Sequence, residues 1–522
     1  MPKRELIEAK KKRKIDYRII PPFWILYFLC SAIRSNVGLA QTMNEDSGHD
    51  LGSVLHATPH QISTGLALFY VCYVVFDLPS NLIMTRLRPH VWMSRIVISV
   101  GVIGACMAGM KRAWSLYLLR LILGIVIAGM WPGMSYYLTL FYPPSRTGKR
   151  IGQYYTAAQI SAAVVGLVSA GFQGMDGDRG LVGFQWMFLV YGVVTVAVGL
   201  ALLWWLPDRP GNPTSTTAVA NTSTTTTTTS TATEKKKKYF NIIPRSRPVL
   251  TGHDAVLHYN DLRRVYHQNK WSARDLLHVF LDWRLWPLLI MYFGVVGVGI
   301  GVQNYATVII QSTNPSLTSV QLSLLSAPIW LFDLAAILLV TPFSDRFHRH
   351  RALFFAVPVC IQIAGLLVVT YAGADDRPWP RYGGLLIVGF GLGPTVPVTM
   401  TWTNELFQPR HGEVGVAAAS AVVSGWGNLG SILTTYALYT GWASDAQAEG
   451  MLKYRKSNLV MVGILCGSIL AAFVMQGALW FADRKTPVAQ DHAVIDGAAR
   501  RETQQRGLHG LGSSITRLWR RK

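Results

Sequence analysis

The sequence predicts an all-α membrane protein in which twelve transmembrane helices form two six-helix bundles. Apolar segments recur along the chain at about 20 residues, the length that a helix needs to cross the hydrocarbon of a bilayer. Half of the 522 residues are hydrophobic and only 15% are charged, with a mean hydropathy of +0.28. One long polar stretch, residues 207–283, separates six apolar segments from six more. This composition excludes a set of ordinary soluble domains.

The apolar segments define the expected spans and domains. The first six are expected at about residues 19–41, 63–84, 92–110, 115–141, 151–172 and 184–206. The last six are expected at about residues 285–311, 320–343, 352–371, 383–404, 415–439 and 458–481. We therefore predict a basic tail (1–18), an N-terminal bundle (19–206), a linker (207–283), a C-terminal bundle (284–482) and a second basic tail (483–522).

The linker and the tails carry most of the positive charge. Residues 214–233 are almost wholly Thr, Ser, Ala and Val, and lysines 235–238 follow. Too little apolar surface is present to order this stretch, which predicts a solvated linker. A net charge of +22 is also typical of nucleic-acid binders. Here the Lys and Arg residues lie between and beyond apolar segments, so we expect a lipid bilayer and no nucleic acid as partner.

Charge asymmetry predicts the orientation. Of the 49 Lys and Arg residues, 38 lie in the tails, the linker, and four alternate loops with their helix ends, and 8 lie in the other loops. The remaining three, Arg34, Arg120 and Arg284, lie within or at the ends of spans. The positive-inside rule then places both termini and the linker in the cytosol. The short loops alone, 10 against 8, would not decide it.

A weak internal repeat supports two equivalent halves. Basic loops follow the second span of each half, at residues 85–90 and 344–351. Duplicated bundles with a central site between them are the arrangement of many secondary transporters.

Several motifs together resemble those of a known family. The loop Ser344-Asp345-Arg346 and the segment from Arg120 to Gly124 resemble signatures of the major facilitator superfamily. Four further segments resemble the allantoate permease branch of the anion:cation symporter family within this superfamily, a fungal type. They are Phe76-Asp77-Leu78-Pro79-Ser80-Asn81, Trp131-Pro132-Gly133, Trp205-Leu206-Pro207-Asp208 and Gly427-Asn428-Leu429-Gly430. The resemblance implies proton-linked import of small organic anions or vitamins such as allantoate, nicotinate, biotin, pantothenate or sulfur-containing acids, at the plasma membrane.

Arg34, in the first span, is the main candidate for binding substrate. A charge within hydrocarbon costs at least about 2.5 kcal/mol, so an intramembrane arginine is a functional-site hypothesis. A guanidinium stays charged and bonds two oxygens of a carboxylate or sulfonate at once. The alternative is that Arg34 extends to the outer headgroups. Asn36 is assigned to the same site, as is Arg120 in the fourth span, which could equally extend to the outer surface.

Two aspartates are candidates for carrying the coupled proton. The resemblance implies acidic residues at two positions that hold Ile33 and Ile127 here, so other groups are needed. Asp77 in the second span and Asp333 in the eighth are the remaining intramembrane carboxylates, and burial disfavours their charged form. Alternatively, each is structural: Asp77 pairs with an arginine at the cytosolic end, and Asp333 caps a polar contact between helices. Uniport therefore stays open.

Other residues complete the predicted site. Polar or aromatic side chains expected to face the cavity are Gln303, Asn304, Trp402 and Asn428; the alternative for each is a contact that holds neighbouring helices together. Asp345 and Arg346 are expected to latch the cytosolic side. The glycines of the seventh span, residues 294–301, and Gly391, Gly393, Pro394 and Pro397 of the tenth are expected bending points. The alternative is that these small residues allow close packing of helices.

The sequence lacks the motifs of two other classes of membrane protein, ATP-driven pumps and membrane enzymes. No Gly-x4-Gly-Lys-Ser/Thr loop occurs, which disfavours an ATP-driven pump. The 13 histidines lie mostly in predicted loops and tails, which disfavours a membrane enzyme, and no metal or cofactor is expected. A uniporter, an exporter and a nutrient sensor of the same fold remain alternatives to a symporter.

Overall fold

The computed structural model describes residues 3–142, 147–209, 249–250, 254–256, 258, 273–314, 316–372, 379–448 and 453–485. Within these ranges, all regular elements are helical, and twelve stretches of helix are long and apolar enough to cross a membrane. The predicted fold class and number of spans are confirmed. The Thr-rich stretch, lysines 235–238 and all but the first residues of the tail 483–522 lie outside the described residues.

Residues 1–472 form one compact unit, and residues 473–522 form a second. The boundary falls within the last helix, α19 (Arg455–Lys485). All residues of the candidate site belong to the first unit.

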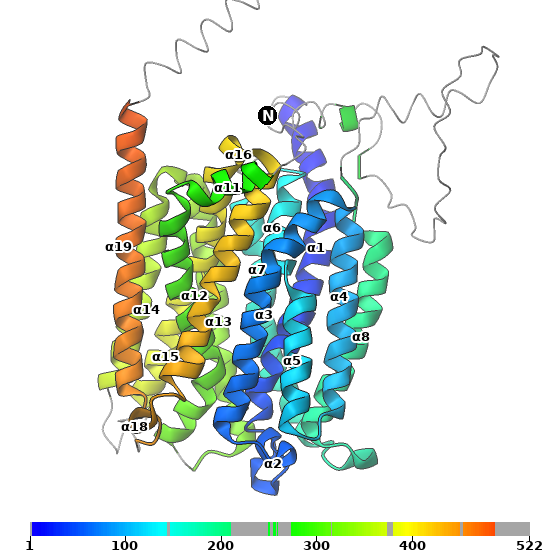
Figure 1. Cartoon of the computed structure of the whole chain (residues 1–522), viewed down its shortest axis with the longest axis vertical. Coiled ribbons are helices and arrows are strands. Elements are labelled where there is room, and N and C mark those ends of the chain that lie inside the picture. The colour runs from blue at the N-terminus through cyan, green and yellow to red at the C-terminus, as the bar shows by residue number, and fades with distance from the viewer. Residues whose placement is uncertain are drawn as a thin grey trace, which may run out of the picture. The chain divides into compact units, whose positions relative to one another are not determined.

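The N-terminal half contains six spans, coloured blue to cyan-green in Figure 1. They are α1 (Lys3–Ala40), α3 (Pro59–Arg86), α4 (Pro89–Cys106), α5 (Ala113–Ile127) with α6 (Met130–Thr139), α7 (Gly148–Gln173) and α8 (Gly183–Trp205). Helix α1 extends through nearly all of the predicted tail 1–18, because Lys, Arg, Glu and Ala are strong helix formers. The basic residues therefore prolong the first membrane helix.

The C-terminal half follows the short helix α11 (Ala273–Leu281). Its spans are α12 (Leu285–Thr313), α13 (Ser319–Arg346), α14 (Arg351–Tyr371), α15 (Trp379–Leu392) with α16 (Thr395–Gly427), then α17 (Leu429–Ile432) with the π-helix η6 (Leu433–Leu438), and α19. The tenth and eleventh spans follow each other without a loop inside α16, and Gly412 (φ 64°) turns the chain between them.

Two spans are broken at equivalent places in the two halves. The fourth span breaks at Gly129, between α5 and α6, and the tenth breaks at Gly393 and Pro394, between α15 and α16. The bend expected in the tenth span is thus found. The seventh span, α12, is continuous, and its glycines serve close packing: a Cβ on Gly297 would lie 2.8 Å from the backbone of Gly430.

Contacts between helices show how the first unit is assembled. In the N-terminal half, α4 packs on α8, α1 on α7 and α3 on α5. In the other half, α14 packs on α15, α12 on α16 and α13 on α15. The halves meet mainly where α7 contacts α13 and α3 contacts α16. We call the end of the bundle where α1 begins and α8 ends the tail side, and the opposite end the far side (Figure 1); the tail side is the one predicted to be cytosolic.

Candidate functional site

A cavity lies between the two halves of the first unit. Its walls come from α1, α3, the α5–α6 break and α7 on one side, and from α12, α13, α15 and α16 on the other. Its empty volume is about 710 Å³, counting the part open to solvent. A cavity of this size suits a small organic molecule, and its position matches the central site predicted from the repeat.

Arg34 lines this cavity from α1 and is partly exposed within it. Tyr27, Tyr70, Tyr73 and Tyr155 are close enough to interact with its charge. Among the residues that the structure describes, no carboxylate forms an ion pair with Arg34. The cavity therefore presents a fixed positive charge that no carboxylate of the described residues neutralises through an ion pair.

Aromatic rings form the wall beside Arg34. The ring centroids of Tyr27 and Trp131 are 5.2 Å apart in a stacked arrangement, and Trp131 lies 5.1 Å from Tyr155. Tyr73, Tyr292 and Trp330 line the same cavity. Sequence reasoning did not assign these residues to the site. Trp131 stands in a motif that carries the family resemblance, and that was the one signal in the sequence.

Of the other predicted contacts, Gln303 and Asn428 also line the cavity. Asn36, Asn304 and Trp402 do not. The side chain of Asn36 is fully buried on another face of α1, Asn304 is 8% exposed and lies beside Gly38 of α1, and Trp402 is buried in α16. Successive residues of one helix point to different faces of the bundle, which a hydropathy pattern alone does not resolve.

Arg120 lies behind the cavity wall and does not extend to the far surface. Its side chain is 1% exposed, and Nη1 donates a 3.2 Å hydrogen bond to the carbonyl oxygen of Arg34. Its guanidinium carbon lies 5.9 Å from the centre of the Phe69 ring. Arg120 thus supports the segment of α1 that carries Arg34.

Asp77 stabilises the break in the fourth span. Its Oδ1 accepts a 2.7 Å hydrogen bond from the N–H of Gly129, at the start of α6. An acceptor at this place satisfies one of the free donors of a helix N-terminus. Gly129 has φ +81°, and a Cβ there would lie 2.4 Å from Ser80 Oγ. The partner of Asp77 is therefore a backbone N–H, and no arginine of the described residues forms the ion pair considered as its structural alternative.

Asp333 occupies the corresponding place in the C-terminal half. It lies on α13 against the break of the tenth span, where a Cβ on Gly393 would be 2.2 Å from Asp333 Oδ1. The residue is 0% exposed, and neither carboxylate oxygen has a hydrogen-bond partner among the described residues. Trp330, one turn earlier on α13, lines the cavity, so Asp333 lies directly behind that wall.

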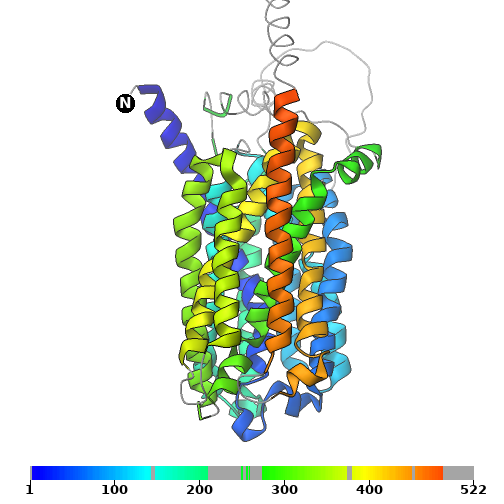
Figure 2. The same ribbon diagram turned by 90° about the vertical axis from the view of Figure 1, so that its left-hand side faces the viewer.

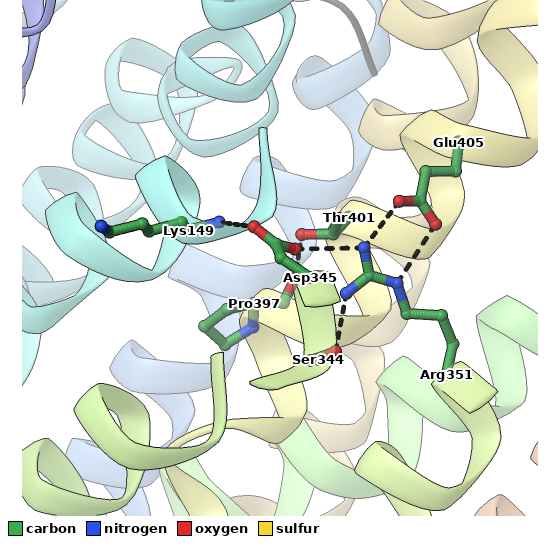
Figure 3. A network of polar contacts seen from close by, with 7 residues as sticks. All are labelled: Lys149, Ser344, Asp345, Arg351, Pro397, Thr401 and Glu405. Atoms are coloured by element: carbon green, nitrogen blue, oxygen red, sulfur yellow. Dashed lines mark hydrogen bonds and ion pairs between the residues drawn. The ribbon is translucent and has the colours of Figure 1, made fainter. Parts of the chain in front are cut away.

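A polar network joins the halves at the tail side (Figure 3). We call it the tail-side network; it comprises Lys149, Ser344, Asp345, Arg351 and Glu405. The N–H of Lys149 on α7 donates to Asp345 Oδ2 at 2.5 Å. Arg351 donates to Asp345 Oδ1 at 3.1 Å, to Glu405 Oε1 at 2.6 Å and to Ser344 Oγ at 2.6 Å.

The arginine in this network is Arg351, whereas the sequence led us to expect Arg346. Arg346 is exposed at the end of α13 and forms no ion pair with Asp345 in the described part of the chain. Arg351 is 1% exposed and reaches Asp345 from the start of α14. Both arginines belong to the same basic loop, and only the turn of the loop decides which one points inward.

At the far side the halves also touch. Ser63 Oγ on α3 lies 3.1 Å from Tyr305 OH on α12, and Tyr305 OH donates to the carbonyl of Thr435 at 3.3 Å. Contacts between the two halves therefore lie beyond the cavity toward both the tail side and the far side.

Comparisons with known proteins agree with this architecture. Residues 23–435 match the family model described as Major Facilitator Superfamily. The chain is 47% identical over 474 residues to Vitamin H transporter 1 of Schizosaccharomyces pombe, covering 90% of this chain and 80% of that protein. An uncharacterized transporter of the same yeast is 43% identical over 502 residues, covering 95% of this chain and 76% of the other.

A solved structure supports the fold. The proton:xylose symporter XylE superposes with a TM-score of 0.63 at 14% identity, covering 88% of this chain and 96% of that one. At that identity the likeness concerns the fold alone. The extent of the family match and the identity to relatives covered over most of their length together carry the assignment: this chain belongs to the Major Facilitator Superfamily of membrane transporters.

Proposed function

We propose that this transporter imports a small organic anion by proton symport, and that the anion is a vitamin-like carboxylate of the biotin type. The observation that carries the proposal is Arg34, an arginine that lines the central cavity without an ion-pair partner among the described residues. An unneutralised guanidinium in a low-dielectric cavity attracts a carboxylate and can bond both of its oxygens. We also propose that the chain belongs to the allantoate permease branch of the anion:cation symporter family.

The aromatic wall supports a substrate with a ring. Tyr27, Trp131 and Tyr155 place flat apolar faces beside the charge of Arg34. Biotin combines a compact ring system with a carboxylate on a short chain, and so needs both features. The relative named as a vitamin H transporter favours biotin among the anions that the family resemblance implies.

The proposed proton carrier is Asp333. An ionised carboxylate buried without any donor is costly, so Asp333 is stable as the neutral acid until a conformational change brings water or a donor to it. Asp77, in contrast, already accepts the N–H of Gly129, and we assign it a structural role. Binding of a proton at Asp333 behind the cavity wall would link proton and anion movement.

Uptake of labelled substrate tests the proposal. Cells expressing the chain receive radiolabelled biotin, nicotinate, pantothenate, allantoate or a sulfonate at several external pH values. We expect uptake of biotin that is faster at acid pH, and a loss of about 30-fold or more in Arg34→Ala, the effect of removing one partner of a buried charged pair. Arg34→Lys, which keeps the charge and loses the planar fork, should retain part of the activity.

Other outcomes have definite meanings. Normal uptake by Arg34→Ala, with equal amounts of protein at the membrane, would refute the assigned substrate site. Uptake of one anion at a rate independent of pH would make the protein a uniporter. Binding of a labelled anion without flux into the cell would identify a sensor that keeps the transporter fold.

A further inference from the structure

The start of α1 is a strongly basic helix that has no part in the transport mechanism proposed above. We propose that this segment, residues 3–18, binds the anionic phospholipid headgroups of the adjacent leaflet, and that this contact stabilises the closed tail-side network. The proposal concerns lipid and gate, and it does not depend on which anion is carried.

Aromatic residues mark the depth of the membrane surface at this point. Tyr17, Trp204 and Trp205 are 70%, 57% and 44% exposed, and Arg18 lies over the Trp205 ring at 5.1 Å and bonds the carbonyl of Trp204 at 3.5 Å. Exposed Trp and Tyr at the ends of spans lie at headgroup level. The bilayer surface on the tail side is therefore beside the turn of α1 that contains Tyr17.

The basic run follows immediately on the water side of that turn. Seven of residues 3–14 are Lys or Arg, against Glu5 and Glu8, and positions 10–14 are basic without interruption. At the rise of an α-helix this run lies about 5 to 11 Å from Tyr17 along the axis. That is about one Debye length, roughly 8 Å at physiological ionic strength, so the headgroup charges are felt there.

The direction of the helix favours lipid over protein as its partner. Figure 2 shows the first turns of α1 leaning outward from the bundle, away from the other helices of the first unit. Helix α1 contains Pro21 and Pro22, residues that bend helices. A basic helix that leans over the surrounding bilayer faces headgroups.

The carboxylate of Asp16 joins the start of α1 to Tyr142, which follows α6, and to Arg150 of α7. Asp16 accepts hydrogen bonds from Arg150 Nε at 2.6 Å, from Arg150 Nη2 at 3.0 Å and from Tyr142 OH at 2.6 Å. The guanidinium of Arg150 also lies over the Tyr142 ring at 3.8 Å. The position of the basic helix is thus coupled to the first turn of α7.

Lys149, the residue before Arg150 in α7, belongs to the tail-side network. Helix α7 begins at Gly148, so the N–H of Lys149 has no acceptor within its own helix, and Asp345 of the other half accepts it instead. Two adjacent residues of α7 therefore have partners on different elements: Arg150 binds Asp16 of α1, and Lys149 binds Asp345 of α13. Lipid that holds the start of α1 at the surface would therefore hold the first turn of α7 in place for Asp345.

Hydrogen exchange of the full chain in lipid nanodiscs tests this inference. The discs contain phosphatidylcholine alone or with phosphatidylserine added, and the measured quantity is the exchange rate of the peptide that contains the Lys149 amide. We expect exchange about threefold slower with phosphatidylserine, a modest effect typical of partly exposed charges. Replacing Lys10, Lys11, Lys12 and Lys14 by Gln should abolish the difference between lipids.

Two further arms separate the steps. Asp16→Asn should also remove the lipid dependence at Lys149, because it breaks the ion pair with Arg150 while keeping the basic run. Soluble polyglutamate added to phosphatidylcholine discs should have no effect. Equal exchange in both lipids, an unchanged lipid effect in the Gln variant or in Asp16→Asn, or full protection by polyglutamate would each overturn the proposal.

Discussion

At the residue scale, the two intramembrane aspartates share a position and differ in their partners. Asp77 and Asp333 each lie against the break of the span two further along in their own half. Asp77 accepts the Gly129 N–H, whereas Asp333 has no hydrogen-bond partner among the described residues. A carboxylate without donors exchanges its proton when its surroundings change, and this difference in partners is the reason for proposing different roles for the two aspartates.

This difference predicts distinct effects of two isosteric substitutions. Asp333→Asn should remove the pH dependence of uptake and prevent accumulation of substrate against its gradient, because an amide carries no exchangeable acid proton. Asp77→Asn keeps an oxygen that can accept the Gly129 N–H, and we expect uptake that still rises at acid pH. Initial rates of uptake between about pH 4.5 and 7.5 measure both. Retained pH dependence in Asp333→Asn would exclude Asp333 as the carrier.

An aspartate in a far-side loop provides the matched control. Burial raises the pKa of Asp176, but hydrogen bonds from His49 (2.5 Å) and from the N–H of Gly183 (2.9 Å) outweigh it and hold the pKa below its usual range. The stability that these bonds provide is present above the ordinary pKa of about 3.9 and is lost only as the pH falls through the lowered value. Asp176→Asn should therefore leave the shape of the uptake profile between about pH 5 and 7.5 unchanged.

At the scale of elements, the break in the fourth span depends on one glycine. Gly129 adopts φ +81° and packs against Ser80, so that α6 can begin with its N–H bonded to Asp77. An L-residue with a side chain is strained in this conformation, and an added Cβ would lie 2.4 Å from Ser80 Oγ.

Gly129→Ala should accordingly destabilise the protein by about 2 kcal/mol or more, the sum of backbone strain and a steric conflict. Thermal unfolding of the purified chain in detergent measures the effect as a lower Tm. Gly171→Ala is the control, since Gly171 lies within α7 and a Cβ there meets nothing within 4 Å. Equal Tm values for the two variants would show that the break tolerates a side chain.

At the scale of the whole first unit, alternating access requires contacts that join the halves at one end and part at the other. The tail-side network joins the halves through a carboxylate on α13 that caps α7 of the opposite half and binds Arg351 of its own, and we propose that it is one of these contacts. Charge-assisted hydrogen bonds of this kind contribute about 1.5 to 3 kcal/mol each.

Asp345→Asn should therefore increase the fraction of molecules open at the tail side. In a chain whose five natural cysteines are replaced by alanine, Thr401→Cys, at a site 1% exposed beside the network, reports the opening by its reaction with a maleimide. We expect a rate about tenfold higher, corresponding to the loss of one such bond. Arg346→Gln, outside the network, should leave the reaction rate unchanged. A higher rate with Arg346→Gln and no change with Asp345→Asn would show that Arg346, and not the Asp345 contacts, keeps the tail side closed.

The sequence by itself determined the fold class and the number of spans, and it marked the residues whose charge is costly within a membrane. Long apolar segments specify membrane helices without reference to any neighbour, because each helix satisfies its own backbone hydrogen bonds. An arginine or aspartate within such a segment is costly wherever it points, so Arg34, Asp77 and Asp333 were recognisable as special residues from the chain alone.

The tertiary structure alone decided which of these residues meet. Arg34 and Arg120 look alike in sequence, yet one lines the cavity and the other lies behind it, bonded to the backbone of the first. Arg346 and Arg351 share a loop, and the chain turn places the second in the network. The aromatic wall was not predicted because Tyr and Trp are common on membrane helices, and only the rotation and packing of each helix select the face that borders the cavity.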